Sequence, residues 1–201
     1  MDQRPSRFSL RGARLGVLRL PDFRYLFAAQ TVSVIGDGIT PVALTFAVLD
    51  LTGSGPDLGL VLGAPSLPLA LLSLVGGVWA DRLRRERVMI ASDLVRAAVQ
   101  LAAAALLLTG VARIWHLALL AACHGAAEAF FRPAAGGLMP QIVPMARLQQ
   151  ANALMGMSDN FGWFVGPMFA GLLVAAVGTG GAIAVDGLTF VVSAAFLSRL
   201  A

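Results

Sequence analysis

Long and predominantly apolar runs constrain the fold of this chain more than any other feature. Six such runs cover residues 25–49, 58–80, 88–109, 114–138, 155–177 and 182–198. A helix needs about 20 apolar residues to cross the hydrocarbon core of a bilayer, and inside lipid a segment must satisfy its own backbone hydrogen bonds. Only 13% of the residues are charged, whereas soluble domains contain about 25%. The sequence therefore predicts an all-α membrane protein with six transmembrane helices.

The arginines predict how these helices are oriented. All 15 basic residues are arginines, and six of them lie in residues 1–24. The other arginines that follow the second, fourth and sixth runs are Arg82, Arg84, Arg85, Arg87, Arg147 and Arg199, and the opposite links carry only Arg113. By the positive-inside rule, residues 1–24 form a cytoplasmic basic segment and both chain ends are cytoplasmic, in the cell (plasma) membrane. An alternative for residues 8–20 is a basic amphipathic helix on the membrane surface.

Several function classes lack the residues that they need. The arginines form short clusters between apolar runs, without a basic face interleaved with aromatic residues, so we expect no nucleic-acid partner. The single cysteine, Cys123, and the two histidines, His116 and His124, have no metal-site spacing. The chain has no lysine for a phosphate-binding loop, and residues 156–160 begin a serine-nucleophile motif without its second glycine. We therefore expect neither enzyme activity nor a cofactor.

The link between the second and third runs carries the most specific motif. Residues 76–87 read GGVWADRLRRER, and the residues that form its pattern are Gly77, Asp81, Arg82, Arg85 and Arg87. A glycine lets a neighbouring helix approach closely, an aspartate can accept backbone amides at a helix N-terminus, and arginines pair with carboxylates. We interpret the motif as a cytoplasmic gate. It resembles the signature of the major facilitator superfamily, with Arg84 at a position where many members have glycine.

Shorter matches extend this resemblance over most of the chain. Residues 36–38, 51–54, 93–97, 147–152 and 166–167 are similar to the exporter branch that includes siderophore and macrolide efflux proteins. The resemblance implies that residues 25–201 are the N-terminal six-helix half of a twelve-helix transporter, built as a 3+3 inverted repeat, whose C-terminal half is absent. The proton-relay arginine of the family is missing, because Ala121 stands at its position.

The function that the resemblance implies is secondary active export of small amphipathic molecules such as drugs, macrolides or siderophores. Its partners would be the lipid bilayer, the small-molecule substrate, protons, and either the missing C-terminal half or a second six-helix chain. The alternative is a six-helix membrane scaffold or partner subunit that transports nothing.

Asp37 is the candidate for substrate or ion coupling. It lies 12 residues into the first run, which is about 18 Å along a helix and near the bilayer midplane. An unpaired carboxylate is costly at this depth, and the flanking glycines permit a locally broken helix of the kind that forms transporter sites. A structural ion pair or a polar helix contact is the alternative.

Other polar and helix-bending residues occupy the later runs. Five charged residues that we expect near the cytoplasmic surface, within reach of the loop 81–87, are Asp93, Arg96, Glu128, Arg132 and Asp159. We interpret them as an ion-pair network that closes the gate, with snorkelling charges on a solvated rim as the alternative. In the fifth run a predicted bend comprises Gly162, Gly166, Pro167 and Gly171. Asp186 is expected toward the outer side, as an interface anchor or a substrate contact.

Overall fold

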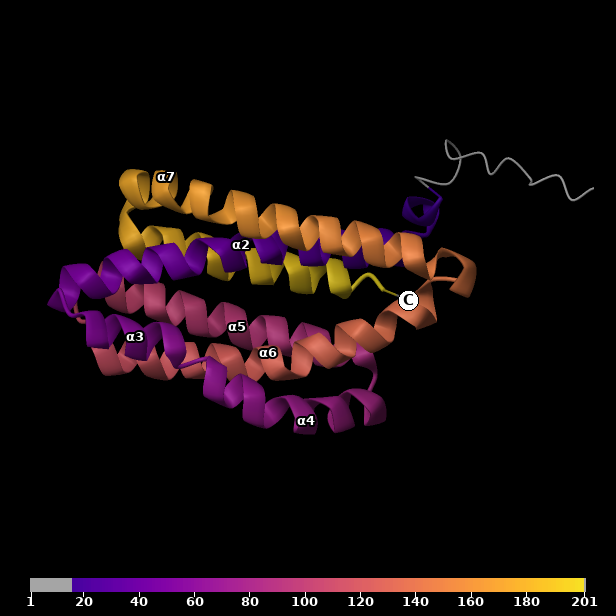
Figure 1. Ribbon diagram of the computed structural model, residues 1–201, viewed down its shortest axis with the longest axis horizontal. Coiled ribbons are helices and arrows are strands. Elements are labelled where there is room, and N and C mark those ends of the chain that lie inside the picture. Colours follow the sequence, from indigo (N-terminus) through magenta and orange to yellow (C-terminus); the bar gives the residue numbers. More distant parts are fainter. Residues whose placement is uncertain (1–15, 201) are drawn as a thin grey trace, which may run out of the picture.

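The computed structural model describes residues 16–200, and all of the regular structure in that range is helical (Figure 1). Its elements are η1 (Val17–Arg19), α2 (Pro21–Thr52), α3 (Gly55–Gly63), α4 (Ser66–Arg82), α5 (Arg85–Leu108), α6 (Ile114–Ile142), η2 (Met145–Arg147) and α7 (Leu148–Leu197). Five segments are long and apolar enough to span a membrane, namely Pro21–Thr52, Gly55–Arg82, Arg85–Leu108, Ile114–Ile142 and Met145–Leu197. The prediction of an all-helical multi-pass membrane protein is confirmed at this level. Most of the predicted basic segment 1–24 and of the alternative surface helix 8–20 lies outside the described residues.

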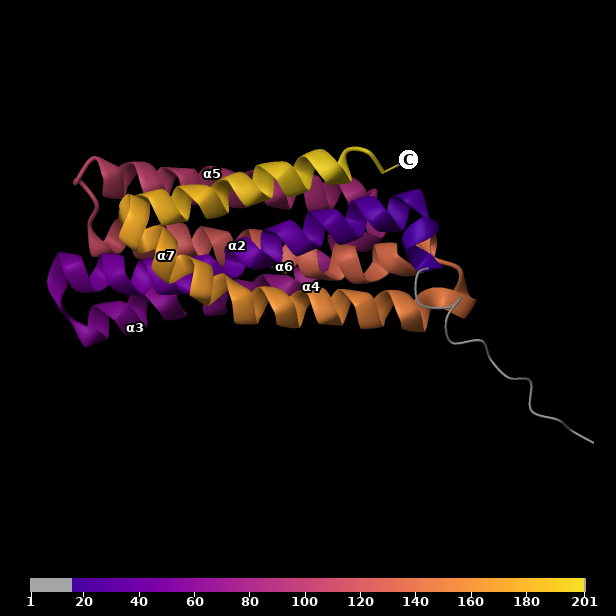
Figure 2. The same cartoon turned by 90° about the horizontal axis from the view of Figure 1, so that it is seen from above.

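The last two predicted helices form one element, α7, that bends back on itself. Gly178 has φ 74° and ψ 175°, the one non-helical conformation inside α7, and these dihedral angles are accessible essentially only to glycine. Figures 1 and 2 both show the residues before and after this point running in opposite directions. We call residues 148–177 the first limb and residues 179–197 the second limb. The sequence predicted a link at residues 178–181, whereas the structure confines the break to Gly178, because Gly180 and Gly181 continue the second limb.

The second predicted helix is divided into α3 and α4. The division lies at Ala64 and Pro65, where Pro65 and Pro68 together remove two backbone donors from the helical hydrogen-bond ladder. The α6 helix approaches closely there, since a Cβ at Gly125 would collide with the backbone of Pro65. This break was not predicted from the apolar run alone.

Both described ends of the chain lie at one end of the bundle (Figure 1). The α4–α5 and α6–α7 links lie at this same end, and the Arg147 guanidinium donates a 2.9 Å hydrogen bond to the Gly16 carbonyl. The arginine-rich links therefore gather on one side, and the link with Arg113 lies on the other.

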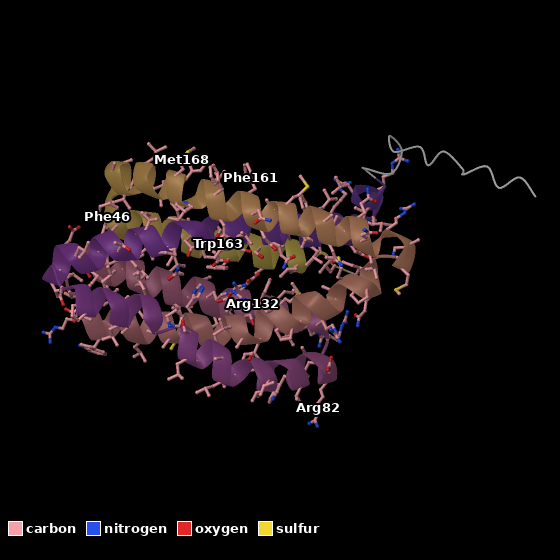
Figure 3. All side chains as sticks on the ribbon, viewed as in Figure 1. Phe46, Arg82, Arg132, Phe161, Trp163 and Met168 are labelled. Carbon is pink, nitrogen blue, oxygen red and sulfur yellow. The ribbon has the colours of Figure 1, made fainter. Side chains whose placement is uncertain are left out.

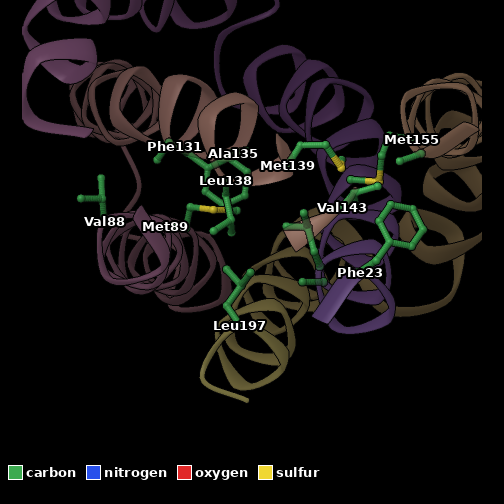
Figure 4. Packing of buried hydrophobic residues seen from close by; sticks show 14 of the residues in the cluster. Phe23, Val88, Met89, Phe131, Ala135, Leu138, Met139, Val143, Met155 and Leu197 are labelled. Atoms are coloured by element: carbon green, nitrogen blue, oxygen red, sulfur yellow. The ribbon is translucent and has the colours of Figure 1, made fainter. Parts of the chain in front are cut away.

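Two hydrophobic clusters hold the helices together. The cluster at the arginine-rich end includes Phe23 of α2, Met89 of α5, Leu138 of α6 and Leu197 of α7, which converge in Figure 4. The cluster at the opposite end includes Ile39, Val48, Val61, Leu117 and Ile183. Along α5 and the second limb, buried polar residues separate the two clusters: Ser92, Asp93, Arg96, Gln100, Asp186 and Ser193. We call this region the polar layer.

The outer surface is strongly apolar. On the first limb of α7, Phe161, Phe164 and Met168 are exposed, and Figure 3 shows Phe161 and Met168 at the periphery of the bundle. On α4, Leu67, Leu71 and Leu74 are exposed as well. Exposed apolar surface of this extent is typical of a protein whose surroundings are lipid or another apolar helix.

Candidate functional site: a cavity between the helices

A cavity of about 680 Å³ opens beside the polar layer. Its walls come from α2, α3, α5, α6 and the first limb of α7, and most of the lining side chains are apolar. The polar and aromatic residues that also line it are Gln30, Ser33, Asp37, Thr40, Arg96, Gln100, His124, Glu128, Phe131, Arg132, Asn152, Asp159 and Trp163. Figure 3 marks Trp163 on the first limb and Arg132 on α6. Four of the five predicted network residues thus share one cavity with Asp37.

Asp37 lies in the wall that α2 provides. The α2 helix is continuous from Pro21 to Thr52, so the locally broken helix that the glycines permitted is not formed. Pro41 has no amide hydrogen to donate to the Asp37 carbonyl four residues earlier. The Asp37 carboxylate lies 3.8 Å from Nε2 of His124 on α6.

The two glycines beside Asp37 serve helix packing. A Cβ at Gly38 would lie 2.9 Å from Cα of Gly166 on the first limb, and a Cβ at Gly36 would collide with the side chains of Asp186 and Thr189. Because α2 carries no side chain at these positions, α7 packs directly against its backbone on both sides of Asp37.

Asp93 and Arg96 form an ion pair inside the bundle. Their relative exposures are 0% and 2%, and the Ser193 hydroxyl donates a 2.6 Å hydrogen bond to the Asp93 carboxylate. The Arg96 guanidinium lies between the rings of Phe131 and Phe190, 4.3 and 4.4 Å from their centroids. A delocalised cation is well suited to such stacking. Arg96 also reaches the cavity, whereas Asp93 does not line it.

Glu128, Arg132 and Asp159 occupy the more open part of the cavity wall. The Arg132 Nε donates a 2.8 Å hydrogen bond to Glu128 one helical turn away, and the Arg132 side chain is 66% exposed. Asp159, on the first limb of α7, is exposed and within electrostatic reach of Arg132. These residues form a charged rim in contrast to the buried Asp93–Arg96 pair.

The charged residues of the 76–87 motif, which spans the end of α4 and the start of α5, pair with one another. Arg85 donates a 2.7 Å hydrogen bond to Asp81, and Arg84 pairs with Glu86. The Arg85 guanidinium also lies over Gly137 of α6, in space that a Cβ there would fill. In this conformation no ion pair among residues 16–200 joins the link to Asp93, Glu128 or Asp159. Arg82 and Arg87 are exposed, and Figure 3 places Arg82 at the end of α4.

The neighbouring glycines of this motif face different surroundings. A Cβ at Gly76 would collide with the Ala129 carbonyl, so the backbones of α4 and α6 approach each other closely at Gly76. Within residues 16–200 nothing lies near a Cβ built at Gly77. The side of α4 that Gly77 occupies is therefore open in this structure, and its predicted role as a docking point stays a prediction.

The residues of the predicted bend also include some in close helix contact and one without a near neighbour. Gly162 packs against the backbone of Val34, and Gly166 against Gly38 and Ile35 of α2. Pro167 lies inside the continuous first limb and would be 3.3 Å from a Cβ at Gly38. Gly171 has no such neighbour in the part of the chain that is described.

Sequence reasoning missed a second polar group in the bundle, centred on Asp186. The Asp186 side chain is completely buried, which argues against its expected alternative as an interface anchor, and its position toward the outer side stays a prediction. Its carboxylate accepts a 2.6 Å hydrogen bond from Thr40 of α2 and another from Gln100 of α5. These partners are 146 and 86 residues away in the sequence, so no local pattern could have identified them. Among residues 16–200 no cluster of three or more histidine, cysteine or acidic side chains could hold a metal ion.

Comparison with known proteins gives consistent matches over most of the chain. The profile of the Major Facilitator Superfamily matches residues 26–201. The chain is 31% identical over 173 residues to the uncharacterized MFS-type transporter YfiS of Bacillus subtilis, covering 86% of this chain and 40% of that protein. It is 37% identical over 167 residues to the multidrug efflux pump Tap of Mycolicibacterium fortuitum, covering 80% and 40% respectively. It is 29% identical over 176 residues to macrolide efflux protein A of Streptococcus pyogenes, covering 85% and 42%. The chain thus spans about two fifths of the length of these relatives.

Proposed function

Because the chain belongs to the Major Facilitator Superfamily, we propose that it is the N-terminal half of a secondary active transporter that exports small amphipathic molecules. Its family is one of membrane transport proteins, not of enzymes. The efflux of drugs and macrolides by two similar proteins supports this direction of transport and this substrate class. Siderophores are a further candidate, from the sequence resemblance.

The cavity is the observation that carries the proposal. It combines apolar walls with a few charged groups from four helices, which is the arrangement that binds an amphipathic molecule and fixes its orientation. In this assignment Asp37 binds the coupling proton or a cationic group of the substrate at the midplane. Protons are the proposed coupling ion, and Asp37 takes this role in a chain that lacks the relay arginine at Ala121.

The proposed topology is six spans, with the two limbs of α7 crossing the membrane separately. The second limb has 19 residues and a length of about 28 Å, enough for the hydrocarbon core. Six spans, arranged as a 3+3 inverted repeat, would put both chain ends in the cytoplasm. The C-terminal half, or a second six-helix chain, would cover the open side of the cavity and receive Gly77 and Asp81.

An export assay tests this function through Asp37. Cells without drug exporters of their own would express the chain with the coding sequence that follows it, and efflux of erythromycin, ethidium and a hydroxamate siderophore would be measured. We expect efflux that depends on the proton gradient. Asp37→Asn should abolish it at an unchanged protein level, whereas Asp50→Asn, at an exposed position of the same helix, should preserve it.

Two results would contradict the proposal. Full efflux by Asp37→Asn would remove this residue from the mechanism. Absence of efflux for every substrate, with the protein correctly inserted, would favour the scaffold alternative.

A further inference from the structure

The polar layer contains two completely buried carboxylates with opposite kinds of partners. Asp93 is paired with the Arg96 guanidinium and with Ser193. Among residues 16–200, the side chains within hydrogen-bond distance of the Asp186 carboxyl group are all neutral, namely Thr40, Gln100 and Thr189. A buried charge without an ionic partner is costly, and such a group commonly becomes neutral instead. The partners of Asp93 thus suit an ionised carboxylate, whereas the partners of Asp186 suit a protonated carboxylic acid.

Hydrogen-bond geometry indicates which oxygen of Asp186 carries the proton. The Oδ2 atom accepts from both Thr40 and Gln100, and Gln100 also donates to Thr40 at 2.7 Å. The Thr189 hydroxyl donates its hydrogen to the backbone carbonyl of Asp186 at 2.7 Å. The same hydroxyl oxygen lies 3.3 Å from Oδ1. Because a hydroxyl has only one hydrogen, an oxygen whose hydrogen binds the backbone carbonyl can accept a hydrogen bond from a protonated Oδ1. A proton on Oδ1 would satisfy this contact.

The absence of a side chain at Gly36 leaves room for the carboxyl group of Asp186. A Cβ at Gly36 would collide with both Oδ1 of Asp186 and the Thr189 hydroxyl. Any larger residue at position 36 would therefore separate the two atoms between which the proton is expected. The α2 backbone closes the pocket around Oδ1 at this point.

The side chains of Thr40 and Gln100 lie between Asp186 and the cavity. Thr40 and Gln100, which bind its Oδ2, both line the cavity wall, and Asp186 itself does not. The charged or titratable side chains that interact electrostatically in this part of the bundle are Asp37 of α2, Asp93 and Arg96 of α5, and His124 and Glu128 of α6. Asp37 and Asp186 repel each other when both are ionised, and Arg96 attracts both. Ionisation of one carboxylate thus favours protonation of the other.

We propose that Asp186 is a proton-binding site that exchanges its proton with the cavity during transport. In the exchange the carboxyl group turns so that its O–H faces Thr40. The O–H bond breaks, the proton passes to the Thr40 hydroxyl, and the hydrogen of that hydroxyl passes to cavity water. Thr40 and Gln100 then stabilise the carboxylate that remains. The reverse step restores the acid. The transport role rests on the proposed function, whereas proton binding does not.

Infrared spectroscopy of the purified chain in lipid tests proton binding directly, because a protonated carboxyl group and a carboxylate absorb at separate frequencies. At neutral pH, Asp186→Asn should lose one protonated-carboxyl band of the wild-type spectrum. Thr40→Val should shift this band, since it removes a 2.6 Å hydrogen bond. Ser193→Ala is the matched control, because it removes a 2.6 Å hydroxyl bond from the other buried carboxylate, and it should leave the band unchanged.

The outcomes separate this proposal from the proposed function. Loss of no band in Asp186→Asn, or the same shift in Ser193→Ala as in Thr40→Val, overturns the proton site. If wild-type cells export substrate and Asp186→Asn keeps full proton-driven export, the exchange role is overturned. If the wild type exports nothing, the proposed function fails, and the infrared result still decides whether Asp186 binds a proton.

Discussion

Gly38 of α2 and Gly166 of α7 contact each other backbone to backbone, so that a Cβ at Gly166 would lie 2.6 Å from Cα of Gly38. The contact brings the first limb of α7 against α2 one residue away from Asp37. It links the packing of the bundle directly to the wall of the cavity.

Gly166→Ala should therefore destabilise the bundle. The added methyl group would meet backbone atoms, which cannot move aside as a flexible side chain can, and overpacking of this kind costs about 1–3 kcal/mol. The measurement is the unfolding midpoint in mixed detergent micelles. Gly171→Ala, where the methyl group meets no described atom, should leave the midpoint unchanged or raise it slightly. Equal midpoints for the two variants would show that the contact does not contribute to stability.

The buried Asp93–Arg96 pair should be more sensitive to single substitutions than the exposed Glu128–Arg132 pair. Arg96→Ala leaves the Asp93 carboxylate buried without its cation, which costs about 3–5 kcal/mol. Arg132→Ala removes an exposed partner and should cost about 0–1 kcal/mol. A double-mutant cycle for each pair, in which the free energy of unfolding is measured for every variant, gives the coupling energies of the two pairs. Similar coupling energies in the two cycles would contradict the distinction.

Asp81→Asn should alter gating without altering stability. The Asp81 side chain is 73% exposed in its pair with Arg85, so the substitution should change the unfolding free energy by less than about 1 kcal/mol. If Asp81 contacts a helix terminus of the other half, that contact contributes about 0.3–2 kcal/mol. Its loss then shifts the equilibrium between inward-facing and outward-facing states by a factor of about two to thirty. The measurement is accessibility of the cavity from the cytoplasmic side in the reconstituted complete transporter. Asp57→Asn, at the start of α3, is the control, and unchanged accessibility in Asp81→Asn would rule out the gate role.

Cysteine labelling of intact cells tests the orientation of the bundle. In a Cys123→Ala background, cysteines at Arg84 and at Ser6, which lies outside the described residues, should be protected from a membrane-impermeant reagent. Cysteines at Ser54 and Thr179 should react, because the positive-inside rule puts the links at α2–α3 and Gly178 on the outer side. The reverse pattern would overturn the proposed topology.

The helical architecture was predictable because length and apolar composition alone determine which segments can span a bilayer. The breaks inside these segments were not. Gly178, Gly180 and Gly181 look equivalent in the sequence, yet only Gly178 leaves the helical conformation, because glycine permits a break without requiring one. The same permissiveness explains why α2 stays continuous through Gly36 and Gly38, where packing against α7 takes the space that a side chain would need.

The candidate site was predictable in part, for a related reason. A charged residue in an apolar run is conspicuous, so Asp37, Arg96, Glu128, Arg132 and Asp159 were identified, and the structure places all five around one cavity. Thr40 and Gln100 are common in helices and were not singled out. Their importance comes from the distant carboxylate of Asp186, which tertiary packing alone brings to them.

Gly178 is the single hinge residue between the two limbs of α7. Gly166 lies on one side of this hinge and Asp186 on the other. Between residues 148 and 197 the chain has no other non-helical residue that could absorb a change in the angle between the limbs. In the proposed transporter, a tilt of the first limb on substrate binding would therefore be passed on to the second limb or be taken up in the dihedral angles of one glycine.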